Sequence, residues 1–113
     1  MLVVFYHNPK CSTSRNALGL LREQGDEPTV VEYLKAGWDR ETLERLASRT
    51  GLGLSGLLRK KEAHAKALLD AGADDEAILA AAIAQPILIE RPIVETDKGA
   101  VIGRPVERVL EVL

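Results

Sequence analysis

The order of local structure in the first third of the chain restricts the fold more than any other feature. Residues 2–6 are apolar and β-prone, and they stop at the turn-forming run His7-Asn8-Pro9-Lys10. Apolar positions at helical spacing then predict a helix over residues 12–24 with Gly25 as its stop, and residues 29–34 are expected to form a short buried strand. This order predicts a parallel βαβ unit with a right-handed crossover.

The middle third of the chain is predicted to be helical. Apolar residues at helical spacing, with capping and breaking residues around them, predict helices from Asp39 to Gly51, near 54–60 and 62–69, and from Asp74 or Asp75 to just before Pro86. No repeat or low-complexity linker sets this block apart. We therefore expect one domain over residues 1–113 that carries a helical insertion over about 39–85.

The last third of the chain returns to strands. Residues 87–89 form an apolar run, and residues 93–96 are expected to pair with 100–102 as a hairpin. Arg104-Pro105 is expected to start a terminal helix, whose predicted buried side consists of Val106, Val109, Leu110 and Leu113. The complete order, βαβ, helical block, ββα, predicts an α/β chain with a thioredoxin-like fold and a mixed central sheet.

Composition excludes several classes of protein. The single cysteine, Cys11, cannot form an internal disulfide or a cysteine-based zinc site, and it suits a reducing compartment. The two histidines, His7 and His64, are too few and too far apart in sequence to complete a metal site with it. A net charge of −2 argues against nucleic-acid binding, and the apolar stretch at 77–84 is too short for a membrane span. Because the start of the chain resembles no secretion signal, a cytoplasmic protein is expected.

Cys11 is the candidate reactive group. It lies between a predicted strand and a predicted helix, where free backbone N–H groups and the helix dipole favour negative charge. Such positions lower thiol pKa values to roughly 3.5–7.5, and the same N–H groups can bind an oxyanion. Ser14 could donate a hydrogen bond to the sulfur, and His7 could stabilise the thiolate as a cation or only hydrogen-bond the loop. The alternative is a buried, inert cysteine, which its polar neighbours disfavour.

Three arginines are candidates for oxyanion binding. Arg91 and Arg104 each precede a proline at a predicted strand end, and Arg59 ends a short predicted helix. Guanidinium groups bind tetrahedral oxyanions in a bidentate manner and never lose their charge. Spacing alone does not indicate whether the three converge, so separate surface arginines remain the alternative.

The order of four motifs resembles that of the glutaredoxin-dependent arsenate reductases, the ArsC family, and in particular its shorter members. These motifs are His7-Asn8-Pro9-Lys10-Cys11-Ser12-Thr13-Ser14-Arg15-Asn16, Leu57-Leu58-Arg59-Lys60, Pro86-Ile87-Leu88-Ile89-Glu90-Arg91-Pro92-Ile93-Val94 and Ile102-Gly103-Arg104-Pro105. The resemblance covers nearly the whole chain.

This resemblance implies reduction of arsenate to arsenite through an adduct between arsenic and the thiolate of Cys11. Arg59, Arg91 and Arg104 match the family's oxyanion-binding arginines. His7 matches the histidine held to help activate the thiolate. Pro92 matches a proline with a cis peptide bond near the site.

The resemblance also implies the other reactants. Reduced glutathione would be a co-substrate and glutaredoxin the protein partner, with no bound cofactor and no metal. Since the chain holds one cysteine, a second thiol must come from outside it. The alternative function is a glutathione-linked thiol protein, or a protein-binding regulator, that keeps the fold without physiological arsenate reduction.

Overall fold

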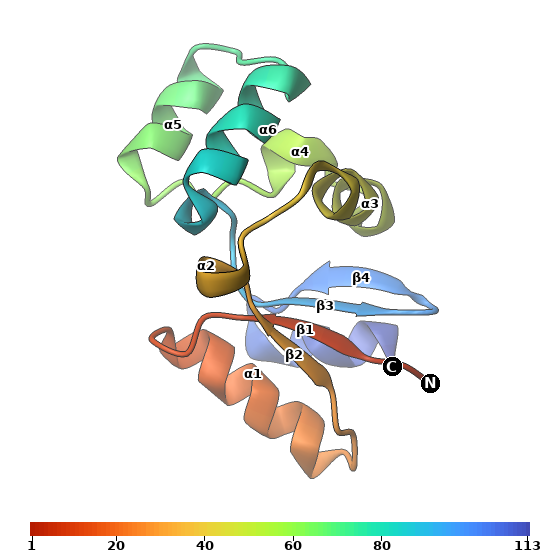
Figure 1. Cartoon of the computed structure of the whole chain (residues 1–113). Coiled ribbons are helices and arrows are strands. Elements are labelled where there is room, and N and C mark those ends of the chain that lie inside the picture. Colours follow the sequence, from red (N-terminus) through yellow and green to blue (C-terminus); the bar gives the residue numbers. More distant parts are fainter. The chain divides into compact units, whose positions relative to one another are not determined.

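The chain consists of two compact units. The computed structural model describes all residues, Met1–Leu113. The first unit joins Met1–Ala36 to Arg91–Leu113, and the second spans Gly37–Glu90 (Figure 1). The expectation of one domain with a helical insertion over about 39–85 stays a prediction.

A four-stranded mixed sheet forms the centre of the first unit. Its strands are β1 (Val4–His7), β2 (Thr29–Glu32), β3 (Ile93–Thr96) and β4 (Gly99–Ile102), in the spatial order β2-β1-β3-β4. β1 pairs with β2 in parallel, whereas β3 pairs antiparallel with both β1 and β4. The predicted α/β class, mixed sheet and C-terminal hairpin are therefore confirmed.

Two helices cover one face of this sheet. They are α1 (Ser12–Glu23) and the 3₁₀ helix η2 (Val106–Val112). Both contribute to the same apolar cluster, together with alternate residues of the strands, so they lie on the same face (Figure 1). The buried members are Val3, Phe5, Ala17, Leu18, Leu21, Val94, Val101, Val109 and Val112.

The prediction of a buried strand over residues 29–34 is wrong in two respects. β2 pairs with β1 alone and forms an edge of the sheet, and the side chain of Val30 is accordingly 37% exposed. The chain also leaves the strand after Glu32 and turns into the short helix α2 (Tyr33–Ala36). An apolar run does not distinguish an edge strand from a central one, because that depends on what pairs beside it.

The predicted terminal helix forms, but its buried side differs from the prediction. η2 is a 3₁₀ helix, in which residues three apart lie on the same side. Val106, Val109 and Val112 therefore face the sheet, and Leu110, which an α-helical period would bury, is 39% exposed.

The second unit is helical. Its elements are α3 (Arg40–Thr50), α4 (Gly53–Gly56), α5 (Ala63–Asp70), α6 (Asp75–Ala84) and the 3₁₀ turn η1 (Pro86–Leu88). The predicted caps are confirmed: the side chain of Asp39 accepts from Thr42 N over 2.7 Å, and that of Asp74 accepts from Ala77 N over 2.9 Å. Gly51 ends α3 at a φ of 73°, a left-handed conformation that suits glycine.

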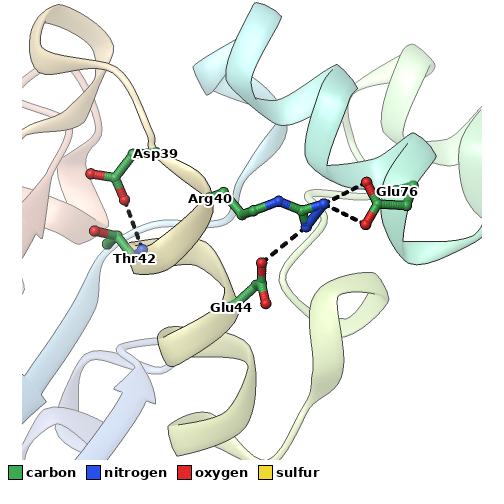
Figure 2. A network of polar contacts seen from close by, with 5 residues as sticks. All are labelled: Asp39, Arg40, Thr42, Glu44 and Glu76. Atoms are coloured by element: carbon green, nitrogen blue, oxygen red, sulfur yellow. Dashed lines mark hydrogen bonds and ion pairs between the residues drawn. The ribbon is translucent and has the colours of Figure 1, made fainter.

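Arg40 links two helices of this unit. Figure 2 shows its guanidinium group between Glu44, one turn along α3, and the carboxylate of Glu76 on α6. All three side chains are at least half exposed, so solvent screens their attraction. The contact therefore adds little to the stability of the unit.

No helix of the chain has the length and apolar character needed to cross a bilayer.

Candidate active site

The loop between β1 and α1 places Cys11 at the start of a helix, where the sequence predicts it. Cys11 is the N-cap residue of α1, with an extended backbone conformation (φ −96°, ψ 122°). Its N–H donates to the carbonyl oxygen of Asn8 over 3.0 Å, and its own carbonyl accepts from Arg15 N over 3.0 Å. The thiol is half-buried, so it is held in a defined loop and remains accessible.

Arg91 and Arg104 converge on this thiol. Nη1 of Arg104 lies 3.9 Å from Sγ of Cys11, and the side chain and charge of Arg91 lower the pKa of the same thiol. The same Nη1 donates to the carbonyl oxygen of Arg91 over 3.1 Å, which joins the two arginines.

The register of the β3–β4 hairpin explains this convergence. Ile93 and Ile102 are directly paired across the two antiparallel strands. Arg91 lies two residues before Ile93, and Arg104 lies two residues after Ile102, so both leave the hairpin at the same end. The further bond from Gly103 N to the carbonyl oxygen of Pro92, 2.9 Å long, extends the pairing toward the arginines.

Electrostatics around Cys11 favour the thiolate. Burial raises the pKa of the thiol, but the backbone N–H of Ser14 and the side chains of Arg91 and Arg104 together lower it more. The resulting pKa is about 7, below the ordinary value for cysteine. A thiol of this kind is substantially ionised at neutral pH and is nucleophilic.

His7 and Ser14 contact each other directly. Nδ1 of His7 lies 2.7 Å from Oγ of Ser14, and the same oxygen accepts from Asn8 N over 3.1 Å. Burial lowers the pKa of His7, although the charge of Glu32 opposes this effect. The neutral imidazole is therefore favoured. The sequence left open whether His7 stabilises the thiolate as a cation or only hydrogen-bonds the loop, and the second alternative matches this geometry. The Ser14 hydroxyl thus bonds His7 and Asn8, and it is the backbone N–H of Ser14 that lowers the pKa of the Cys11 thiol.

Pro92 lies where β3 meets the site. The peptide bonds Arg91–Pro92 and Arg104–Pro105 are both cis. Gly103 packs so closely against this segment that a Cβ atom there would lie 3.0 Å from Cγ of Pro92 and 2.8 Å from Cγ1 of Val109. The absence of a side chain at Gly103 therefore permits the approach of the two arginine-bearing segments.

Arg59 belongs to the second unit, and its role at Cys11 stays a prediction. Its Nη1 pairs with Oε1 of Glu90 over 2.6 Å, and its backbone N–H donates to the carbonyl oxygen of Leu88 over 2.7 Å. Leu58 and Ile89 form an isolated antiparallel bridge beside it. The apolar run at 87–89 thus forms a 3₁₀ turn and one bridge in place of a regular strand.

Two residues of the loop were not singled out by the sequence. Arg15 donates from Nη1 to the carbonyl oxygen of Pro9 over 2.9 Å. Asn8 accepts through Oδ1 from Lys10 N over 3.0 Å. An asparagine before a proline is a turn signal, and it could have identified Asn8 as a structural residue of the loop.

The fold and the site define a class of protein. Its members combine a mixed sheet with a single thiol that lies at a helix N-terminus beside two guanidinium groups. The profile of the ArsC family matches residues 6–112. The chain belongs to the ArsC family, and the thioredoxin-like fold expected from the sequence is confirmed by its structural neighbours.

Its relatives include proteins with and without a named activity. The chain is 44% identical over its whole length to an arsenate reductase of Rhizobium meliloti (strain 1021), 82% of which is covered. It is also 45% identical to the uncharacterized protein YfgD of Escherichia coli (strain K12), over 98% of the chain and 96% of that protein. A solved structure of an arsenate reductase from Vibrio cholerae superposes with a TM-score of 0.92 at 46% identity, covering 100% of the chain and 98% of that structure.

Proposed function

We propose that this chain is an arsenate reductase whose nucleophile is the thiolate of Cys11. The observation that carries the proposal is the convergence of Arg91 and Arg104 on a thiol whose pKa is about 7. Relatives that share 40–46% identity and are named arsenate reductases support the substrate class.

The arrangement suits attack on a tetrahedral oxyanion. The thiolate supplies an electron pair to arsenic, and an arsenic-bound oxygen leaves as water after protonation. Arg91 and Arg104 neutralise the negative charge that otherwise repels the thiolate, and the first-turn N–H groups of α1 add further donors. In this proposal Arg59 is a third oxyanion ligand, and neutral His7 acts by orienting Ser14.

The electrons for the reduction come from outside the chain, because Cys11 has no partner cysteine. Conversion of arsenate to arsenite takes up two electrons. In the proposal, the thiols of reduced glutathione and of glutaredoxin supply them and leave as a mixed disulfide, with release of one water. Glutathione is thus a co-substrate, glutaredoxin is a protein partner, and Cys11 is regenerated as arsenite leaves.

Arsenate-dependent consumption of reduced glutathione tests the proposal. The purified chain is assayed with glutaredoxin, glutathione reductase and NADPH, first with arsenate and then with phosphate in its place. We expect NADPH oxidation only with arsenate, and none with the Cys11→Ser variant. That substitution is nearly isosteric, so a thermal melt should show an intact fold.

Two results would contradict the proposal. Activity that survives in Cys11→Ser would remove the thiolate from the mechanism. A wild-type chain that shows no arsenate-dependent oxidation, while Cys11 still titrates near its pKa of about 7, would favour the alternative of a thiol protein with another substrate.

A further inference from the structure

Asn8 makes three hydrogen bonds within the loop that joins β1 to α1. It follows directly after β1, its side chain is 3% exposed, and three of its polar groups are bonded inside the loop. Its N–H donates to Oγ of Ser14, its carbonyl accepts from Cys11 N, and its Oδ1 accepts from Lys10 N. These bonds span residues 8–14, which we call the thiol loop.

We propose that Asn8 is a positioning residue that shapes the thiol loop and so decides which backbone N–H groups face the sulfur and a bound anion. The inference deepens the proposed function and rests on Cys11 being the reactive group.

Asn8 closes two turns at once. The bond from Cys11 N to the carbonyl oxygen of Asn8, 3.0 Å long, closes a four-residue turn with Pro9 in its second position. The bond from Lys10 N to Oδ1, also 3.0 Å long, is an Asx-turn inside it. Pro9 has no N–H, so these two bonds occupy both backbone donors between Asn8 and Ser12.

The backbone donors that remain lie in the first turn of α1. The N–H groups in the first turn of α1 have no intrahelical acceptors. The N–H of Ser14 lowers the pKa of the Cys11 thiol, and those of Ser12 and Thr13 belong to the same turn. Because Asn8 occupies the N–H groups of Lys10 and Cys11, the donors available to an anion are confined to this turn.

Ser14 connects Asn8 to the environment of the sulfur. The N–H of Asn8 holds Oγ of Ser14 at 3.1 Å, and the backbone N–H of the same serine lowers the pKa of the Cys11 thiol. If the turn at Asn8 opens, this attachment loosens and the donor moves away from the sulfur. An asparagine supplies the acceptor without charge, whereas an aspartate would put a second negative group beside the thiolate.

The test uses the chain's only other asparagine as a matched control. Asn16 lies exposed on α1, so Asn8→Ala and Asn16→Ala make the same chemical change at nearby positions. The measurement is the pH dependence of Cys11 alkylation by iodoacetamide, which involves no arsenate. We expect Asn8→Ala to raise the midpoint by about one pH unit, a tenfold loss of thiolate at low pH, and Asn16→Ala to leave it unchanged.

A second measurement follows the turn itself by amide hydrogen exchange. The amide of Lys10, an exposed residue, should be protected in the wild-type chain and in Asn8→Asp, and unprotected in Asn8→Ala. If the Lys10 amide is protected in Asn8→Asp but not in Asn8→Ala, the protection depends on the side-chain oxygen of residue 8. If Asn8→Ala does not fold, the wild-type and Asn8→Asp exchange rates decide the question.

The proposal is overturned if Asn8→Ala keeps the wild-type alkylation midpoint. It is equally overturned if the Lys10 amide exchanges at the rate of an unstructured peptide in the wild-type chain or in Asn8→Asp. Neither readout depends on arsenate turnover, so failure of the arsenate assay and failure of this proposal are distinguishable.

Discussion

The guanidinium group of Arg104 donates to the backbone carbonyl oxygen of Arg91 over 3.1 Å while the same nitrogen lies 3.9 Å from the sulfur of Cys11. The bond to the Arg91 backbone thus helps to position the guanidinium group of Arg104. Both charges lie beside the thiol, so a change to either segment should alter the pKa of Cys11.

Removal of Arg104 should raise the pKa of Cys11. Arg104→Ala deletes a cation beside the thiolate and a bond to Arg91, and we expect the alkylation midpoint to rise by about one unit, or ~1.4 kcal/mol. Arg108→Ala is the matched control, because Arg108 is exposed and pairs with Glu111 on the same 3₁₀ helix. Equal midpoints in the two variants would contradict a direct effect of Arg104 on the sulfur.

The wild-type thiol should titrate near neutrality. The pKa of Cys11 is lowered to about 7, so its alkylation rate should rise with pH to half of its maximum near that value and fall below it as the thiol is protonated. At pH 7 half of the protein is thiolate, against about 3% for an ordinary thiol with a pKa near 8.5. Reduced glutathione, titrated in parallel, provides the reference. A midpoint at the reference value would show that the arginines do not act on the thiol.

His7 should make the fold sensitive to acid. Burial lowers its pKa, so the unfolded chain binds a proton that the folded chain rejects, and stability is lost as the pH falls below the ordinary histidine value of about 6.5. His7→Asn should flatten the decline in the free energy of unfolding by at most about 1.4 kcal/mol per pH unit. Urea unfolding at several pH values between 5 and 8 measures this slope.

His64→Asn is the control for this experiment, since His64 is the only other histidine and is exposed. We expect it to keep the wild-type slope. If the free energy of unfolding depends on pH equally in His7→Asn and the wild-type chain, the pKa of His7 is not lowered by folding.

A methyl group at Gly103 should destabilise the first unit. The new Cβ would lie 2.8 Å from Cγ1 of Val109 and 3.0 Å from Cγ of Pro92, so one of these neighbours must move. We expect Gly103→Ala to lower the free energy of unfolding by about 1–3 kcal/mol, the usual cost of overpacking. The thiol pKa should rise as well, because the arginine segments on either side are displaced.

Gly19→Ala is the matched substitution for Gly103→Ala. Gly19 lies on α1 with no atom within 4 Å of its added Cβ, so alanine there should stabilise the chain by about 0.5–1 kcal/mol through helix propensity. Urea unfolding of both variants gives the comparison. A Gly103→Ala variant as stable as the wild-type chain would show that the segments can separate without cost.

Most of the local structure could be predicted from the sequence. The helix N-caps at Asp39 and Asp74, the C-terminal glycine at Gly51 and the position of Cys11 before α1 were all expected and are all observed. Each of these features depends on residues within four positions of one another. Side-chain chemistry and backbone preference act at that range, so a single sequence carries the signal.

The tertiary structure alone decided the features that depend on pairing between distant segments. β2 is an exposed edge because no strand pairs on its other side, and Leu110 is exposed because η2 packs as a 3₁₀ helix. Arg91 and Arg104 meet at Cys11 because Ile93 pairs with Ile102. Their places before prolines at predicted strand ends identified these arginines as candidates, but their convergence follows from strand register, which results from packing across the whole sheet.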